Sequence, residues 1–330
     1  MSNRLPQMRQ WLDSLGYQDY TIEVASADAS FRSYWRLHQD DESWIVMDAP
    51  PDKEPCDAYV MVAKKLTDKG LNAPRILHEN HDQGFLLLTD FGNQSYLQAL
   101  NADNADSLYG DAIEVINRMQ SRIDADDLPP YDEALLRYEM GLFDEWFLGK
   151  LLGIELERNQ LEIWQATTDK LVQNALEQPQ VFVHRDYHSR NLMKLEQGNP
   201  GIIDFQDAVK GPVSYDLVSL LRDCYIEWPQ VKVDQWLRYF LSNSELEQLH
   251  GTEPAEFNRW FNLMGIQRHL KAVGIFSRLK LRDGKPQFMQ DIPRTLNYIR
   301  VVSAEEPGMS GLHGLIDELG LASRLKSHLQ

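Results

Sequence analysis

Cysteine is scarce in this sequence, and long hydrophobic runs are absent. The 330 residues include two cysteines, Cys56 and Cys224, too few for the disulfide framework of a small secreted domain. No stretch approaches the roughly 18 apolar residues that a membrane-spanning helix needs. The N-terminal stretch MSNRLPQMRQWLDSLGY also lacks the apolar core of a signal peptide. These absences predict a cytoplasmic protein without membrane association, in which both thiols are packing residues.

Positive charge is also in short supply. The chain has 33 Lys and Arg against 50 Asp and Glu, a net charge of −17. Nucleic-acid binding needs a cationic surface that displaces phosphate counterions, so we expect no nucleic-acid partner. The acidic balance is compatible with a cationic substrate, but general solubility is the simpler explanation, because net charge does not say which face is charged. The sequence indicates no obligate protein partner.

The residues that are present predict a globular protein with two lobes. Hydrophobic residues make up 43% and aromatic residues 10% of the chain, and its length suffices for two lobes. Strands and turns dominate up to Leu88, and helical periodicity dominates after Asn93. We therefore expect an α+β fold. It has a small β-rich N-terminal lobe at residues 1–88, a hinge at 89–93, and a larger, mainly helical C-terminal lobe at 94–330.

The patterns also place the individual elements. In the first lobe they predict helices at Leu5–Leu15 and Asp57–Lys69, each followed by a glycine, and strands in TIEVASADASFRSYWRL, in WIVM and on both sides of HENHDQG. In the second lobe, apolar stripes predict helices at 106–122, 132–152, 159–176, 259–281, 289–302 and 312–325, and one capped by Ser214. Gly265 and Gly274 are expected to allow close approach in the long helix 259–281.

The stretch Val181–Gln206, VFVHRDYHSRNLMKLEQGNPGIIDFQ, carries the candidate chemistry. Its pattern predicts strand, polar loop, strand, turn and strand, which brings Asp186, Asn191 and Asp204 together at strand ends. Asp186 is the candidate base, because a hydroxyl that attacks phosphorus needs a carboxylate to accept and orient its proton. Asn191 and Asp204 are the candidate Mg²⁺ ligands. The alternative, an ordinary polar loop between strands, is disfavoured by the joint pattern H-x-D-x-x-x-x-N followed by I-I-D-F.

Several neighbouring residues are expected to support this cluster. His184 suits a packing and hydrogen-bonding role in the loop. Asp216, near a helix start, suits either a buttress of the loop or a helix cap. Asp207 fits a second metal, the substrate or a capping role equally well. Arg185 and Arg190 flank the loop, where they fit phosphate contacts or pairing with nearby acids.

The candidate nucleotide contacts lie in the first lobe. The loop between the first two strands has small residues but no glycine. Its backbone N–H groups around Ser30 and Phe31, with the charge of Arg32, could hold phosphates, although an ordinary hairpin explains the loop as well. Leu88 and Asp90 are expected to present backbone groups to the nucleotide base. Asp90 begins an Asp-Phe-Gly tripeptide, but it precedes the HRD loop, so we interpret it as part of a hinge rather than a metal site.

The motifs HRDYHSRN and IIDFQDA resemble those of the aminoglycoside phosphotransferase and choline kinase group of small-molecule kinases. The order of elements matches over essentially the full chain, which implies a bilobal protein-kinase-like fold. Within that group, the pieces SADASFRSYWRL, WIVMDAPP, VHRDYHSRNL and QRHLKAVGIFSRL look most like bacterial anomeric kinases of N-acetylmuramate and N-acetylglucosamine. The resemblance assigns the catalytic role to Asp186 and the metal roles to Asn191 and Asp204.

One departure from the group is a missing ion pair. Related kinases place a Lys or Arg on the third strand and pair it with a Glu on the next helix. Here Met47 or Asp48 occupies the strand position, and the helix Asp57–Lys69 has no Glu. A rearranged phosphate clamp is expected, with Arg32 or Lys53 as the substitute cation.

The resemblance implies an enzyme that uses ATP and Mg²⁺ to phosphorylate a sugar, at the anomeric hydroxyl of N-acetylmuramate or N-acetylglucosamine in peptidoglycan recycling. One alternative is a kinase for an aminoglycoside or amino alcohol. Another is a pseudokinase-like nucleotide-binding module. The carboxylate of N-acetylmuramate needs a cation nearby, for which the candidates are Arg32, Arg190, Arg268 and Lys271.

Overall fold

The computed structural model describes residues 4–27, 32–246, 249 and 251–329. Contacts within the chain divide it into two compact units. The first is Met1–Ser95 with Leu192–Asp207, and the second is Tyr96–Asn191 with Ala208–Gln330. The first is built on a sheet and the second is mostly helical, which confirms the expected α+β class.

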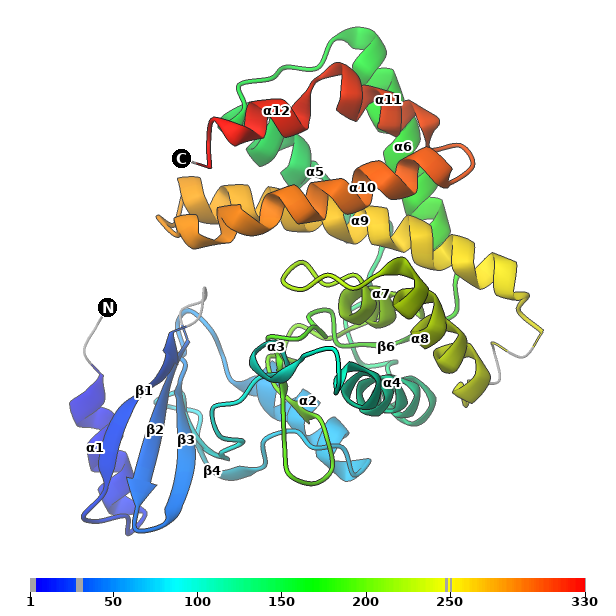
Figure 1. Ribbon diagram of the computed structural model, residues 1–330. Helices are drawn as coiled ribbons and strands as arrows, with labels where there is room; N and C mark the ends of the chain where they lie inside the picture. The colour runs from blue at the N-terminus through cyan, green and yellow to red at the C-terminus, as the bar shows by residue number, and fades with distance from the viewer. Residues whose placement is uncertain (1–3, 28–31, 247–248, 250, 330) are drawn as a thin grey trace. The chain divides into compact units, whose positions relative to one another are not determined.

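The first unit contains an antiparallel sheet of five strands in the order β1-β2-β3-β5-β4 (Figure 1). Hairpins connect β1 to β2 and β2 to β3, and β5 lies between β3 and β4. Strands β3 and β5 are the most completely buried, in keeping with their apolar runs WIVM and FLLL. The strands are β1 (Thr21–Ala27), β2 (Ser33–Gln39), β3 (Glu42–Asp48), β4 (Ile76–Asn80) and β5 (Phe85–Thr89).

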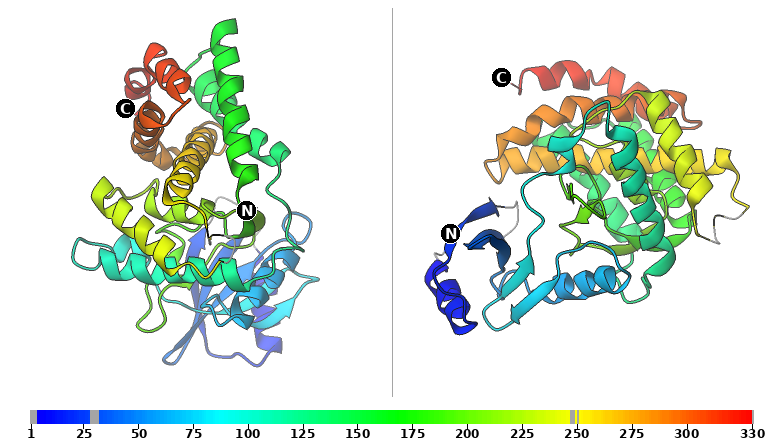
Figure 2. Two further views of the ribbon diagram at one scale, coloured as in Figure 1. Left: turned by 90° about the vertical axis from the view of Figure 1, so that its right-hand side faces the viewer. Right: turned by 60° about the horizontal axis from the view of Figure 1, so that its bottom comes forward.

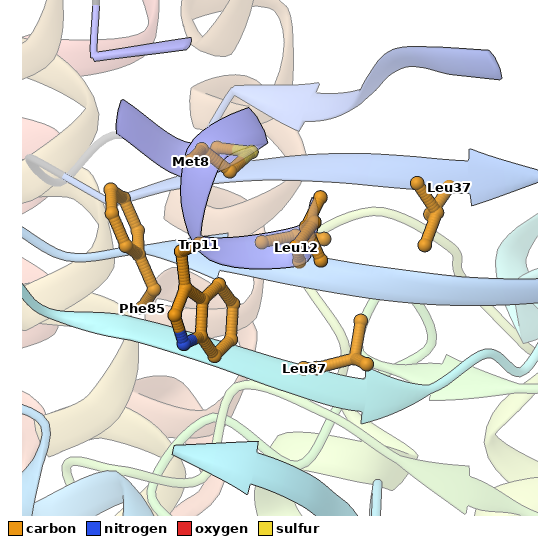
Figure 3. Packing of buried hydrophobic residues seen from close by; sticks show 7 residues of the cluster. Met8, Trp11, Leu12, Leu37, Phe85 and Leu87 are labelled. Atoms are coloured by element: carbon orange, nitrogen blue, oxygen red, sulfur yellow. The ribbon is translucent and has the colours of Figure 1, made fainter. Parts of the chain in front are cut away.

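Helix α1 (Leu5–Ser14) covers one face of this sheet. Its apolar residues recur every three or four positions, so they share one side of the helix. Met8, Trp11 and Leu12 point toward the strands, where they meet Leu37, Phe85 and Leu87 (Figure 3). Trp11 stacks on Phe85 with ring centroids 5.6 Å apart. This packing fixes α1 against the first half of β5.

The segment Leu192–Asp207 groups with the first unit, whereas the sequence placed everything after residue 93 in the second lobe. It contains the short strands β7 (Leu192–Met193) and β8 (Gly201–Ile202). The Lys194 N–H donates to Gln94 O at 2.8 Å, and the Ile202 N–H donates to Asn72 O at 2.7 Å. Such pairings escape a local sequence pattern, because their partners lie about a hundred residues away.

Aromatic packing also binds this segment to the first unit. Phe205 packs on Tyr59 of α2 (Asp57–Asp68) with ring centroids 4.8 Å apart. A Cβ atom at Gly201 would come within 2.7 Å of the Phe91 ring, so glycine is required there. The final strand of the catalytic stretch is therefore held by residues of the first unit.

The second unit is organised around α9 (Pro254–Leu281), which is buried on nearly every side. It contacts α10 (Ile292–Glu305), and the two run alongside each other in Figures 1 and 2. It also contacts α5 (Glu133–Leu142), η1 (Phe143–Leu151), α6 (Arg158–Glu177) and α7 (Tyr215–Leu221). The predicted close approach occurs at Gly274, where a Cβ atom would lie 2.4 Å from the Leu142 carbonyl carbon.

The remaining elements differ from the prediction at several points, and the helix α8 (Gln230–Asn243) was not predicted. The helix predicted at 132–152 is α5 (Glu133–Leu142) followed by a π-helix, η1 (Phe143–Leu151). The helix predicted at 312–325 is interrupted by Gly320, whose φ is 58°. Ser214 precedes α7 but does not cap it, since its hydroxyl donates to Gln178 instead, at 2.7 Å. The other elements are α3 (Tyr96–Ala99), α4 (Ala105–Arg122), α6 (Arg158–Glu177), β6 (Gln180–Val183), β9 (Val209–Pro212), α7 (Tyr215–Leu221), α8 (Gln230–Asn243), η3 (Pro286–Asp291), α11 (Ser310–Glu318) and α12 (Leu321–Lys326). Across the described residues, no helix combines the length and the apolarity that crossing a membrane requires.

Candidate active site

The polar loop His184–Asn191 follows β6, and its first residues are hydrogen-bonded to Asp216. This residue is fully buried in the first turn of α7. Its carboxylate accepts the backbone N–H of His184 at 2.7 Å and that of Arg185 at 3.0 Å. Arg185 has a φ of 79°, a conformation that non-glycine residues adopt rarely. The two hydrogen bonds hold the strained turn that leads into Asp186.

Asp186 lies among positive charges. Burial raises the pKa of Asp186, but Lys271, His188, Arg268 and Arg185 oppose this, and the pKa lies below its usual value. The carboxylate is therefore ionised at neutral pH. An ionised carboxylate can accept a hydrogen bond from a substrate hydroxyl and orient it.

A buried network ties this loop to α5 and α9. Glu139 of α5 is 2% exposed and accepts hydrogen bonds from the guanidinium of Arg185 and the hydroxyl of Tyr131. Lys271 of α9 lies 3.2 Å from the same carboxylate and donates to the hydroxyl of Tyr215 at 3.1 Å. Burial raises the pKa of Glu139, but Lys271 and Arg185 hold it below its usual value. Of the two roles predicted for Arg185, the structure shows the pairing with an acid.

Asn191 closes the loop. Its backbone N–H donates to His188 O at 2.9 Å, and its side-chain nitrogen donates to Asp186 O at 3.1 Å. Because the side-chain nitrogen is hydrogen-bonded within the loop, the side-chain oxygen is the atom that would bind a metal ion. Ser189 anchors the middle of the loop, because its backbone N–H donates to Asp223 at 2.9 Å.

Asp204 lies in the first unit, directly after β8. It has a φ of 65°, in the left-handed region that Asp tolerates better than most residues. Gln206 donates to its Oδ1 at 2.8 Å. Burial and the nearby Asp204 carboxylate together raise the pKa of Tyr59. Asp207 is exposed in the following turn.

The donor set of Asn191 and Asp204 fits Mg²⁺. One supplies an amide oxygen and the other a carboxylate, and Mg²⁺ prefers such hard oxygen ligands. Within the described residues, no group of three His, Cys, Asp or Glu side chains forms a cage for a metal. Mg²⁺ in nucleotide sites takes one or two protein ligands and completes its shell with phosphate oxygens and water. The two residues belong to different units.

The predicted nucleotide contacts fall partly outside the described residues. Ser30 and Phe31 lie in the undescribed segment 28–31. Arg32 pairs with Glu54, with 3.0 Å between nitrogen and oxygen. Leu88 is buried in β5, where it pairs with Ile45 of β3.

Asp90 has a structural partner that the sequence did not reveal. Its carboxylate accepts hydrogen bonds from Arg36 of β2 at 2.6 and 3.0 Å and from the Gly92 N–H at 2.9 Å. Burial raises the pKa of Asp90, but these hydrogen bonds bring it below its usual value. The Asp-Phe-Gly tripeptide therefore begins with a carboxylate that is bound by Arg36 and by the Gly92 N–H, and its role as a hinge stays a prediction.

The third strand lacks the expected cation in the structure as in the sequence. Met47 is fully buried, and Asp48 pairs with Arg4 of the N-terminal segment at 2.7 Å. Burial raises the pKa of Asp48, and Arg4 opposes the shift. Neither candidate for the strand position is a cation, since Met47 is apolar and Asp48 is an acid with its own partner.

Solved structures that match this fold include kinases of small molecules. Choline kinase LicA from Streptococcus pneumoniae matches 91% of this chain and 100% of its own, with a TM-score of 0.65 and 12% identity. Aminoglycoside phosphotransferase APH(2'')-Ib matches 90% of this chain and 98% of its own, with a TM-score of 0.60 and 14% identity. At these identities the likeness establishes the fold class, a kinase-like fold.

Sequence comparisons then give the family. The model of the phosphotransferase enzyme family matches residues 21–252. An N-acetylmuramate/N-acetylglucosamine kinase from Pseudomonas aeruginosa is 43% identical over 96% of this chain and 97% of its own length. A protein of the same name from Neisseria meningitidis is 43% identical over 95% of each. The chain belongs to the phosphotransferase enzyme family and is a small-molecule kinase.

Proposed function

We propose that this kinase transfers the γ-phosphate of ATP to the anomeric hydroxyl of N-acetylmuramate and N-acetylglucosamine, in the cytoplasmic recycling of peptidoglycan. The observation that carries the proposal is the full-length similarity to relatives with this name, at 42% and 43% identity. The loop geometry around Asp186 is consistent with it. A fold-level likeness to choline and aminoglycoside kinases does not select their substrates for this chain.

Asp186 is the proposed catalytic residue. It accepts a hydrogen bond from the sugar hydroxyl and aims the oxygen at the γ-phosphorus. A new oxygen–phosphorus bond forms as the bond from the γ-phosphorus to the bridging oxygen breaks, and ADP leaves. The hydroxyl proton passes to Asp186 and then to solvent. Because the transferred group is metaphosphate-like, the proton moves late, and a carboxylate with a lowered pKa suffices.

The residues Asn191 and Asp204 would hold Mg²⁺. When bound, the ion neutralises charge on the phosphates. Two buried acids of the chain position the loop around Asp186. Asp216 positions the backbone at His184 and Arg185, and Glu139 fixes the Arg185 guanidinium.

The charges around Asp186 are compatible with this acceptor. Lys271, Arg268 and Arg185 all act on its carboxylate. An aminoglycoside or amino alcohol would bring a further positive charge toward these groups. The net acidity of the chain, which is compatible with a cationic substrate, does not describe this neighbourhood.

An acceptor panel tests the proposal. ADP release is followed with N-acetylmuramate, N-acetylglucosamine, kanamycin, choline and no acceptor, and ³¹P NMR locates the phosphate in the product. Turnover of the two N-acetylated sugars to 1-phosphates is expected. The methyl glycoside of N-acetylglucosamine, which has no free anomeric hydroxyl, should stay unchanged. Turnover of the cationic acceptors alone would make the chain an aminoglycoside or amino-alcohol kinase. ATP binding without any turnover would make it a nucleotide-binding module.

A further inference from the structure

Arg190 differs from the other cations near Asp186 in its surroundings. Its side chain is exposed. Its guanidinium carbon lies 4.6 Å from the ring centroid of Tyr225 and 5.4 Å from that of Phe288. Its guanidinium also hydrogen-bonds to the Tyr225 side chain, and it acts on the charge of Asp291. The nearby acid Asp291 is itself paired with Arg294, at 3.5 Å.

The other cations near the Asp186 loop contact partners within the protein. Arg185 and Lys271 share the buried carboxylate of Glu139. Arg268 is 5% exposed and points a guanidinium nitrogen at Cys224 Sγ, 3.6 Å away. A ligand that carries a negative charge would therefore meet Arg190 first.

Arg190 packs against the same ring as His188, which belongs to the Asp186 loop. The His188 N–H donates to Asp186 O at 3.1 Å, and the Asn191 N–H donates to His188 O at 2.9 Å, so the loop folds back on itself. The His188 ring packs edge-on against Tyr225, with 5.2 Å between centroids, and the guanidinium of Arg190 lies over the same ring. Burial lowers the pKa of His188. The Asp186 charge opposes this shift, and the Arg190 charge lowers the pKa further.

The rings under Arg190 form a partly exposed aromatic surface. Tyr225 and Phe288 are half-buried, and the buried Phe276 stacks on Phe288 with centroids 5.8 Å apart. Rings in this position hold the plane of the guanidinium and reduce the entropy lost when it binds a partner. They also offer an apolar face to the C–H groups of a sugar ring.

We propose that Arg190 is a specificity-determining residue that binds the carboxylate of N-acetylmuramate. This sugar is N-acetylglucosamine with a lactyl ether on O3, and the lactyl group carries the carboxylate. The planar fork of Arg190 matches a carboxylate with two parallel hydrogen bonds. The inference rests on the proposed function and explains how one site accepts a charged and a neutral sugar. When N-acetylglucosamine binds, the Arg190 guanidinium stays hydrated.

The experiment compares the two sugars in the Arg190→Met and Arg190→Lys variants. Loss of a charge-assisted hydrogen bond should raise KM for N-acetylmuramate about 10–100-fold. KM for N-acetylglucosamine and for ATP should change by less than about threefold, since the proposal gives Arg190 no contact with sugar hydroxyls or phosphates. The Arg190→Lys variant should recover part of the loss. A further test replaces the lactyl carboxylate of N-acetylmuramate by a carboxamide. The wild-type chain should show the same raised KM for this analogue that the Arg190→Met variant shows for N-acetylmuramate.

Arg300→Met is the matched control, because it also removes one positive charge. Arg300 lies at the surface and pairs with Asp317 at 2.8 Å. Its variant should keep the wild-type ratio of the two sugars. Equal losses for both sugars in Arg190→Met, or an unchanged ratio, would overturn the inference while leaving the proposed function in place. Failure of the wild-type chain to phosphorylate either sugar would overturn the proposed function, and the inference with it.

Discussion

Asp216 accepts the backbone N–H of Arg185, a residue in the left-handed conformation, at 3.0 Å. The same carboxylate accepts the N–H of His184. One buried side chain thereby satisfies two adjacent backbone donors at the point where the chain turns toward Asp186. Burial raises the pKa of Asp216 to about 7, although the two hydrogen bonds oppose the shift.

The Asp216→Asn variant should lower stability and change its pH dependence. An amide has one acceptor oxygen, so one of the two buried N–H groups loses its partner, at a cost of about 1–3 kcal/mol. In the wild-type chain, the folded pKa lies above the unfolded one, and the folded state binds the proton more tightly. Its contribution to the free energy of unfolding is therefore full below pH 4 and declines as the pH rises toward 7.

Urea unfolding at several pH values between 4 and 8 measures this effect. The variant should show a weaker decline than the wild-type chain across that window. An identical slope in both proteins would mean that Asp216 does not hold the raised pKa.

The Asp186→Asn variant should lose kcat and keep its fold. The substitution preserves size but removes the charge that orients the hydroxyl, and a loss of about 10²–10⁴-fold is expected. Binding of ATP should persist, because the carboxylate is proposed to act on the acceptor. Steady-state kinetics with N-acetylglucosamine and calorimetry with a non-hydrolysable ATP analogue separate the two effects. Near-normal turnover would contradict the assignment of Asp186.

The Asp204→Ala variant should abolish the Mg²⁺ dependence of nucleotide binding. A carboxylate supplies most of the protein's charge on such an ion. The affinity for ATP is measured by calorimetry with Mg²⁺ and with EDTA. Asp82→Ala is the control, since Asp82 is an exposed acid of the same unit, in the turn between β4 and β5. A response to Mg²⁺ that equals the control's would count against the metal role of Asp204.

The Asp90→Ala variant should destabilise the protein and leave its Mg²⁺ dependence intact. The pair with Arg36 is buried, and the loss of one partner leaves an uncompensated charge, at a cost of about 3–5 kcal/mol. Thermal unfolding and Mg²⁺ titration of ATP binding are measured on the same samples. If Mg²⁺ dependence were lost and stability kept, the tripeptide would have to be a metal site after all.

Two glycine substitutions should move stability in opposite directions. At Gly274 a methyl group would press against the backbone of Leu142 and Phe143, so Gly274→Ala should cost about 1–3 kcal/mol. At Gly110, inside α4, a Cβ atom would meet nothing within 4 Å. Gly110→Ala should therefore stabilise the helix by about 0.5–1 kcal/mol. Chemical unfolding of both variants tests the pair, and equal effects would show that the approach of α9 to Leu142 is loose.

Local patterns explain why much of the fold could be predicted. Strands β1 to β5 follow runs of β-branched and aromatic residues between turns, and α1 and α2 end before glycines with positive φ. The loop of Asp186 was recognisable because its polar residues are contiguous and stand between two apolar runs. The close approach at Gly274 could be anticipated because glycine is unfavourable in a helix without a packing reason.

Partners that are distant in sequence could not be predicted in the same way. Glu139 lies in an ordinary amphipathic helix, and no spacing rule connects it to Arg185. The pair of Arg36 and Asp90 joins a strand to the connection after β5, across 54 positions. The break at Gly320 was missed because the apolar stripe continues on both sides of it. These ion pairs and this helix break depend on tertiary contacts, which the local sequence pattern does not indicate.

The return of Leu192–Asp207 to the first unit has a consequence for biosynthesis. A ribosome delivers the five-stranded sheet early, but β7, β8 and Phe205 emerge only after the whole stretch Tyr96–Asn191. Until then Tyr59 lacks the ring that covers it, and Asn72 lacks the amide that bonds to its carbonyl. The first unit is thus finished late in translation, and a nascent chain cut before residue 207 would expose an uncovered aromatic surface to chaperones.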